Sequence, residues 1–351
     1  MNRSDDIADA LRGELTSGRY RAGNLLPSVD FLQTRFGCGE YSVRRALQQL
    51  RDEGLLSIRQ HIGTVVTATR SRAWKGHVAF IHTSRRAAFF VSRLSVILGN
   101  RFEAAGWCYH PVFMATAKDG QIDTEAIERH IANGLDFALV LSEFRQIAAL
   151  LDRAGVPYAV LNGYARDFPN ACGVIRDDLR QCFADLVAAL KASGVSDVVE
   201  FDCERRMNRD FKNILFAAGI DSHRILLAWD NERPHSITDF RALGHSAITE
   251  FLADGHNRAH LPDVFLFTDD YLASGAIAAL YEAGLRIPDD IRVVSFINRG
   301  DEPALGVTMA RIENDPDAYG ETVADYALDI LAGRHPAPPR VPWRFIPGDS
   351  L

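Results

Sequence analysis

The first seventy residues have the hydrophobic periodicity of short helices followed by two short strands. Apolar residues three or four positions apart predict helices over about 4–18, 28–37 and 39–54. The runs LLSIR and TVVTA, separated by QHIG, predict a hairpin that turns at Gly63. The pattern therefore predicts a compact helical unit with a hairpin behind it.

The third of these helices has an apolar face and a polar face. Val43, Ala46, Leu47 and Leu50 follow the i, i+3, i+4, i+7 pattern, and a GCG turn joins this helix to the one before it. Five polar side chains point away from the stripe or lie at its edges, and they can hydrogen-bond base edges or phosphates: Tyr41, Ser42, Arg44, Arg45 and Gln48. This arrangement is typical of a winged helix-turn-helix, although a helical cap with a solvated arginine face has the same spacing.

The same stretch resembles the winged helix of GntR-type transcription regulators. The motifs SGRYRAGNLLPS, SVRRALQQLRDEGLL and RQHIGTVV carry the resemblance, in the family's order. It implies binding of double-stranded operator DNA, with arginines of the second and third helices and the wing tip in contact. Pattern and resemblance together assign ten DNA-binding residues: Ser28, Tyr41, Ser42, Arg44, Arg45, Gln48, Arg59, Gln60, His61 and Gly63.

Two acidic residues depart from that family's pattern. Asp30 and Glu40 stand where arginines are usual, and His61-Ile62 replaces the usual Gly-Lys or Gly-Arg of the wing. A carboxylate repels phosphate but can accept a hydrogen bond from cytosine N4. We therefore expect an operator unlike the family's typical one and a lower affinity.

Beyond a polar linker at 70–76, short apolar runs alternate with segments of helical length. Such runs, rich in Val, Ile and Phe, indicate parallel sheets covered on both faces. The expected strands form two sets of four, which suggests two similar lobes: 77–82, 108–114, 137–141 and 158–162, then 197–201, 225–229, 264–267 and 292–296. Ligands bind such sheets at the carboxyl ends of the strands, so we expect a site in an interlobe cleft.

This second region resembles the LacI/GalR effector domain, which has the periplasmic-binding-protein fold. The segment PDVFLFTDDYLASGAIAALYEAGLRIPDDIRVVSF carries the resemblance most strongly. The resemblance implies a homodimer whose two heads read two half-sites, and lobes that close on a small molecule, commonly a sugar. Asp270 stands where the family has a ligand-contacting aspartate, and its alternative role is the N-cap of the following helix. Asn298 replaces a usual aspartate.

Further candidates for the effector site follow from position. Ser84 and Phe90 come near the exit of the first strand, Arg206 comes near the exit of the fifth, and Tyr271 adjoins Asp270. Each can equally be an ordinary loop or packing residue.

Charge is distributed unevenly along the chain. Residues 1–72 contain eleven arginines and eight acidic residues and so have a net charge of +3. Because the whole chain has a net charge of −7, the remaining residues have a net charge of −10. No acidic residue occurs between Gly54 and Phe102. This asymmetry favours an anion-binding module attached to an acidic body.

The chemistry of an enzyme or a metalloprotein is not apparent. The sequence lacks G-x-S-x-G and G-x-x-x-x-G-K-[ST] motifs, and its five cysteines include no C-x-x-C pair. His256 and His260 are spaced i, i+4 in an expected loop without a third ligand. We expect no catalysis, no cofactor, no metal, no membrane segment and a cytoplasmic location with reduced thiols.

The sequence thus predicts a winged helix-turn-helix (α+β) at 1–69, a linker at 70–76, and a two-lobed α/β periplasmic-binding-protein-like domain with parallel sheets at 77–351. The lobes are expected at about 77–162 plus 297–315 and about 163–296 plus 316–351. The predicted function is a ligand-responsive transcriptional regulator, a repressor, that binds operator DNA and a sugar-like effector. The alternatives are a sensor whose head contacts proteins, or a sugar-processing enzyme.

Overall fold

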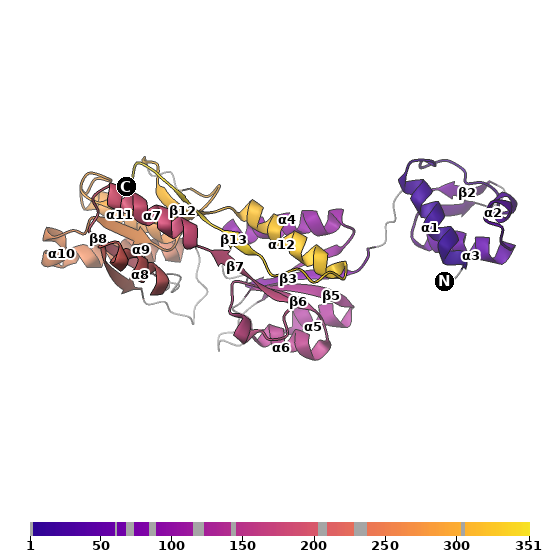
Figure 1. Cartoon of the computed structure of the whole chain (residues 1–351), viewed down its shortest axis with the longest axis horizontal. Coiled ribbons are helices and arrows are strands. Elements are labelled where there is room, and N and C mark those ends of the chain that lie inside the picture. Colours follow the sequence, from indigo (N-terminus) through magenta and orange to yellow (C-terminus); the bar gives the residue numbers. More distant parts are fainter. Residues whose placement is uncertain are drawn as a thin grey trace. The chain divides into compact units, whose positions relative to one another are not determined.

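The computed structural model describes residues 3–59, 62–67, 74–83, 89–114, 123–141, 145–202, 209–227, 237–302 and 306–351. The chain forms two compact units, Met1–Gly76 with Gly106–Cys108, and His77–Ala105 with Tyr109–Leu351. The first contains three helices and a hairpin (Figure 1): α1 (Arg3–Thr16), α2 (Val29–Phe36), α3 (Glu40–Asp52), β1 (Leu56–Arg59) and β2 (Gly63–Val66). These elements agree with the helices and hairpin expected from the periodicity.

Local sequence signals set the ends of these helices. The Ser28 hydroxyl accepts the Phe31 N–H at the start of α2, and Gly37 ends this helix in the left-handed conformation with φ 58°. The apolar faces of the three helices meet in one core, where Leu11, Leu32 and Leu50 are fully buried. Two hydrogen bonds from Arg12 to Glu53, of 3.0 and 2.6 Å, join α1 to the end of α3.

The second unit contains two six-stranded sheets. The first has the strand order β13-β7-β6-β5-β3-β4, and its strands are β3 (His77–Thr83), β4 (Cys108–Met114), β5 (Leu135–Leu141), β6 (Tyr158–Leu161), β7 (Gly173–Asp178) and β13 (Arg340–Pro342). Its helices are α4 (Phe89–Ala104), α5 (Glu125–Ala132), α6 (Arg145–Ala154) and α12 (Pro316–Leu331). Helices α4 and α12 lie on one face of this sheet, and α5 and α6 on the other (Figure 1).

The second sheet has the order β14-β12-β11-β10-β8-β9. Its strands are β8 (Asp197–Asp202), β9 (Asp221–Leu226), β10 (Val264–Phe267), β11 (Arg292–Asn298), β12 (Ala310–Asn314) and β14 (Arg344–Ile346). Its helices are α7 (Arg180–Ala192), α8 (Arg209–Ala217), α9 (Ile237–Ala253), α10 (Gly255–Ala259) and α11 (Asp270–Glu282). Alternate residues of β10 face two cores, since Leu266 packs with α7 and α8 whereas Phe265 packs with α9 and α11.

Two glycines allow α9 and α11 to pack in close contact. A Cβ added at Gly275 would collide with the Arg241 carbonyl oxygen, and one added at Gly244 would collide with that of Leu272. This packing fixes α11, whose first residue is Asp270, against α9, and both helices share a core with β10 and β11.

The lobe boundaries differ from those expected. The chain passes from the first sheet to the second at 178–180, returns at 314–316, and passes again at 342–344. The end of β11 and all of β12 fall in the range 297–315, which we assigned to the first lobe, but both strands belong to the second sheet. Conversely, β7, α12 and β13 fall in ranges that we assigned to the second lobe, but they lie with the first sheet. The polar run of β7 and the three-residue strands β13 and β14 give little hydrophobic signal.

One expected strand is also displaced. The run at 225–229 was predicted as a strand, but β9 spans Asp221–Leu226 at the sheet edge, and its first four residues are polar. Residues 228 and 229 lie outside the described part of the chain. Among the described residues, no helix has the length and apolar character needed to cross a membrane.

Candidate functional site

The polar face of α3 is open to solvent, as its periodicity predicts. Val43 and Leu50 are fully buried on the opposite face, whereas Tyr41 is 76% exposed. Arg44 and Arg45 are both exposed. The helix therefore presents a tyrosine and two arginines on a surface whose other side is held by the core.

The two arginines differ in their partners. Arg44 donates through Nε to Glu40 Oε1 at 2.6 Å, one helical turn earlier, and both side chains are more than half exposed. Arg45 makes no side-chain hydrogen bond or ion pair with any other described residue. A phosphate that approaches Arg44 must compete with Glu40, whereas one that approaches Arg45 meets an uncompensated positive charge.

The remaining predicted residues of this helix pair take other roles. Ser28 is exposed. Because it caps α2, its hydroxyl already accepts one hydrogen bond within the protein. Gln48 is half-buried and donates from Nε2 to Asp52 Oδ1 at 2.8 Å, and Ser42 is half-buried. Asp30 is exposed in the first turn of α2, where a carboxylate suits the helix dipole but repels phosphate.

The hairpin forms the expected wing. Leu56 pairs with Val66 and Arg59 pairs with Gly63, which has φ 113°, a conformation that favours glycine. The segment before α2 lies alongside β2, because Leu26 N–H donates to the Thr64 carbonyl oxygen at 2.8 Å. Arg59 is exposed, while Gln60 and His61 lie outside the described residues.

In the second unit, Asp270 and Asn298 meet at the carboxyl ends of neighbouring strands. Asn298 Nδ2 donates to Asp270 Oδ2 at 3.1 Å, and the Asn298 backbone N–H lies 3.4 Å from the same oxygen. Asp270 is only 4% exposed. A buried carboxylate with a fixed amide partner can accept further hydrogen bonds from the hydroxyl groups of a ligand.

The structure assigns the helix cap to the preceding aspartate. Asp269 Oδ1 accepts from the backbone N–H groups of Tyr271 and Leu272, both at 3.0 Å, and is the N-cap of α11. Asp270 is the first helical residue, and its Oδ1 accepts from Tyr271 N–H at 3.0 Å. The alternative role given to Asp270, that of N-cap, is therefore wrong.

Asn314 extends this cluster. It is the register partner of Asn298 across β11 and β12, and its Nδ2 donates to Asn298 Oδ1 at 3.3 Å. Asn314 is 2% exposed, and its Oδ1 has no hydrogen-bond partner among the described residues. A buried acceptor of this kind is costly unless a donor reaches it, which makes it a candidate ligand contact. Asn314 was not among the residues expected from the sequence, although its position at a strand end is the signal that identified Asn298.

Tyr271 connects α11 to the first lobe. Its O–H donates to Asp301 Oδ2 at 2.7 Å, and its oxygen accepts the Phe89 backbone N–H at 3.3 Å. Burial, assisted by Asp301, raises the pKa of Tyr271, so the phenol remains protonated at neutral pH. Asp301 and Phe89 were not among the residues expected at this site.

The other effector candidates are not joined to this cluster by a contact among the described residues. Phe90 is half-buried and packs edge-on against Tyr319, with ring centroids 5.2 Å apart. Ser84 and Arg206 lie outside the described residues. The ligand-contact roles of all three remain predictions.

Comparisons with known proteins agree with both parts of the architecture. Residues 3–66 match the family model of bacterial regulatory proteins, gntR family, and residues 192–351 match that of the periplasmic binding protein-like domain. These matches confirm the two resemblances drawn from sequence motifs. Among curated proteins, the HTH-type transcriptional regulator GalR of Streptococcus thermophilus is 34% identical over 84 residues, 24% of this chain and 24% of that protein. The aligned segment thus spans about a quarter of that relative's length.

Solved structures share the fold. The lac repressor dimer bound to operator and the anti-inducer ONPF superimposes with a TM-score of 0.63 and 17% identity, over 78% of this chain and 93% of that one. A LacI family transcriptional regulator from Arthrobacter sp. FB24, in complex with lactose, gives a TM-score of 0.59 and 18% identity, over 79% and 99%. The expected fold class, a helix-turn-helix followed by a two-lobed α/β domain with parallel sheets, is confirmed.

Proposed function

From a chain that joins an N-terminal GntR-family helix-turn-helix domain to a periplasmic-binding-protein-like domain, we propose a ligand-responsive transcription regulator. It binds operator DNA through α3 and the wing, and a small polyhydroxylated molecule at the Asp270–Asn298 cluster. The observation that carries the proposal is the presence, in one chain, of a solvent-facing arginine helix and a buried carboxylate at sheet ends.

The DNA-binding half of the proposal rests on the geometry of α3. A helix held by its apolar face, with Tyr41 and Arg45 exposed on the other, can enter a major groove and contact bases and phosphates. A single short helix reads only a half-site. We therefore infer that the chain acts as a homodimer on a two-part operator, and the lac repressor, which shares the fold of the second unit, is a dimer when bound to its operator.

The effector half rests on the hydrogen-bonding inventory of the cluster. Asp270 offers acceptors, Asn298 an amide with both functions, and Asn314 a buried acceptor oxygen. Such a set suits adjacent hydroxyl groups of a carbohydrate, and the lactose complex of the Arthrobacter protein has the same fold. Because Tyr271 and Phe89 connect the two lobes beside this cluster, ligand binding can bias lobe closure and thereby operator affinity, a coupling of about 1–3 kcal/mol.

Promoter fragments around the chain's own gene provide the test. We expect fluorescence anisotropy to show specific binding at low salt, with an affinity that falls steeply with salt concentration as counterions are released. Unlabelled non-specific duplex should compete poorly, and a panel of mono- and disaccharides should shift the affinity. Salt-independent binding, or none to any fragment, would favour a head that contacts proteins, and turnover of a sugar would indicate an enzyme.

A further inference from the structure

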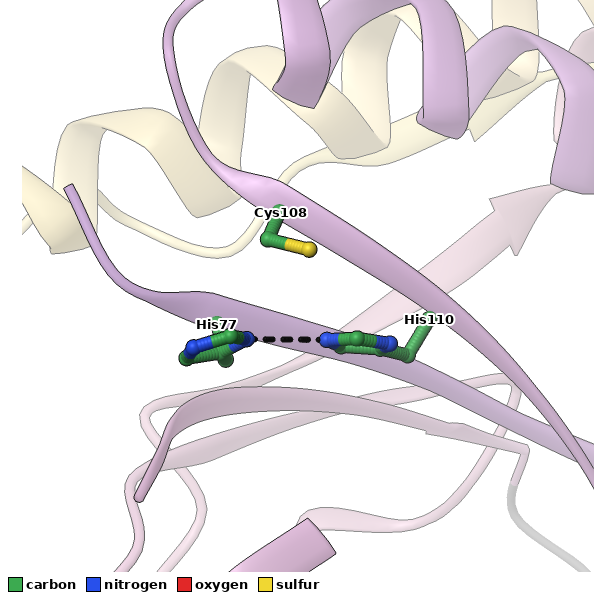
Figure 2. Close-up of side chains that lie close together, drawn as sticks. All are labelled: His77, Cys108 and His110. Carbon is green, nitrogen blue, oxygen red and sulfur yellow. Dashed lines mark hydrogen bonds between the residues drawn. The ribbon is translucent and has the colours of Figure 1, made fainter. Parts of the chain in front are cut away.

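A second cluster of chemically reactive side chains lies at the start of the first sheet, away from the Asp270 cluster. His77 is the first residue of β3, and Cys108 and His110 are the first and third residues of the adjacent strand β4. One ligand atom from each of these residues lies within 4.8 Å of the other two. Figure 2 shows the two imidazole rings and the sulfur gathered beside the two strands.

The backbone of the sheet places these groups together. Cys108 and His110 are two residues apart in one strand and so project from the same face, while Tyr109 between them bonds Ser95 of α4 on the other. The Cys108 N–H donates to the Gly76 carbonyl oxygen at 2.9 Å, which sets Cys108 beside His77. The His77 backbone N–H is itself held by Asp136 at 2.8 Å.

The donor atoms have the chemistry of a transition-metal site. His77 Nδ1 and His110 Nε2 are 2.9 Å apart. Two nitrogen ligands on tetrahedral Zn²⁺, at about 2.1 Å from the ion, are about 3.4 Å from each other, so the rings need to separate by only about 0.5 Å. Imidazole and thiolate ligands select borderline ions such as Zn²⁺ over Mg²⁺ or Ca²⁺.

A third imidazole adjoins the cluster. The ring of His130, near the end of α5, lies 4.8 Å from that of His110 between centroids. His130 is thus placed to supply a fourth ligand after a side-chain rotation, and a water molecule can take that position instead.

We propose that His77, Cys108 and His110 bind a Zn²⁺ ion at the start of the first sheet. This proposal departs from the expectation of no metal, which rested on the absence of a C-x-x-C pair and on the lack of a third ligand beside His256 and His260. The ligands come instead from two strands that are 31 residues apart in the sequence, with C-x-H in the second strand. The His256–His260 pair is different, because His260 Nδ1 is within 3.1 Å of the His256 carbonyl oxygen and both side chains are exposed.

The test uses the full chain with its purification tag removed, and Co²⁺ and Zn²⁺ as probes. We expect one equivalent of Co²⁺ to produce a thiolate-to-metal charge-transfer band that Zn²⁺ abolishes by displacement. Cys108→Ser should lose the band, and His77→Gln and His110→Gln should each weaken Zn²⁺ binding at least about tenfold in chelator competition. The matched controls Cys172→Ser and His260→Gln should leave the band and the affinity unchanged.

A measurement on the unmodified protein guards against variants that fail to fold. Zn²⁺ should slow alkylation of Cys108 by iodoacetamide, mapped by mass spectrometry, while the exposed Cys172 reacts at the same rate with and without the ion. The proposal is overturned if Zn²⁺ protects neither cysteine or both equally, if folded Cys108→Ser retains the charge-transfer band, or if His260→Gln removes the bound equivalent.

Discussion

The two candidate binding surfaces of this chain are built in opposite ways. On α3 the side chains of Tyr41, Arg44 and Arg45 are exposed, and the ion pair of Arg44 with Glu40 is in solvent. Around α11, Asp270 and Asn314 are buried, Asn298 is half-buried, and hydrogen bonds link the three side chains. A surface for a polyanion can rely on long-range charge, whereas a site for an uncharged ligand must hold its donors and acceptors in place beforehand.

The strongest loss that we expect is that of effector binding in Asp270→Asn. The change removes a charged acceptor and sets an amide against the Asn298 amide, at a cost of about 2–3 kcal/mol, or roughly 30- to 150-fold in ligand affinity. Isothermal titration with the responsive sugar measures it. The neighbouring Asp269→Asn is the control, since asparagine can also cap α11 and the variant should keep ligand binding.

Operator binding by Asp270→Asn and by the unmodified chain tests whether the DNA-binding surface acts independently of the effector cluster. DNA affinity without effector should be equal in Asp270→Asn and the unmodified chain. Loss of DNA binding in Asp270→Asn would show that the buried cluster supports the whole fold rather than a ligand.

The second-largest effect that we expect is weaker operator binding by Arg45→Ala. The loss should be about 1–3 kcal/mol if the side chain reaches a base. Arg44→Ala should cost less, because Glu40 already neutralises that guanidinium. Anisotropy titrations at several salt concentrations measure both changes. Arg153→Ala, an exposed arginine of α6, removes the same charge from the other unit and should leave the affinity unchanged.

A smaller change of opposite sign is expected for Glu40→Gln. Removing this carboxylate frees Arg44 and takes a negative charge from the DNA-facing helix, so operator affinity should rise by about 0.5–1 kcal/mol. Glu125→Gln is a close control, because Glu125 pairs with Arg129 in the same i, i+4 geometry on α5. An affinity that falls in Glu40→Gln would instead indicate that Glu40 contacts a base.

The weakest of these changes concerns the stability of the head. Glu14 bonds Arg35 of α2 and Arg19, and the hydrogen bond from Arg35 lowers the pKa of Glu14 below its usual 4.5. A carboxyl whose pKa is lower in the folded state than in the unfolded state stabilises the fold at pH values above its unfolded-state pKa. This stabilisation is lost as the pH falls through the folded-state pKa. Urea unfolding followed by amide NMR signals of α1 should show Glu14→Gln to be less stable by under about 1 kcal/mol at pH 7, with the difference vanishing at strongly acidic pH.

Sequence patterns predicted the elements that are long or strongly periodic. The ends of α2 followed from Ser28 and Gly37, and the central strands from their runs of Val, Ile and Phe. The pattern failed at β7, whose second half is polar, and at β13 and β14, which have three residues each. Those failures moved the lobe boundaries, and the two short edge strands β13 and β14 are specified by tertiary pairing rather than by local hydrophobicity.

In the effector cluster, the sequence predicted only residues at or shortly after the end of an expected strand. Asp270 and Asn298 were predicted from the resemblance to the LacI/GalR effector domain, at positions that follow β10 and end β11, and the structure joins them. The bond between Tyr271 and Asp301 joins residues 30 apart in the sequence, and the placing of His77 beside His110 depends on which strands are neighbours. Neither spacing has a signature in a single sequence, since strand order is settled by packing.

The three chain crossings at 178–180, 314–316 and 342–344 determine how the second unit responds to fragmentation. A protease that cuts within one crossing leaves two covalent bridges between the lobes, so the nicked protein should still elute as a single species from a native sizing column. Separating the lobes takes three cuts, and the excised pieces then interleave along the chain rather than forming contiguous stretches. A truncation from either end therefore yields no isolated lobe.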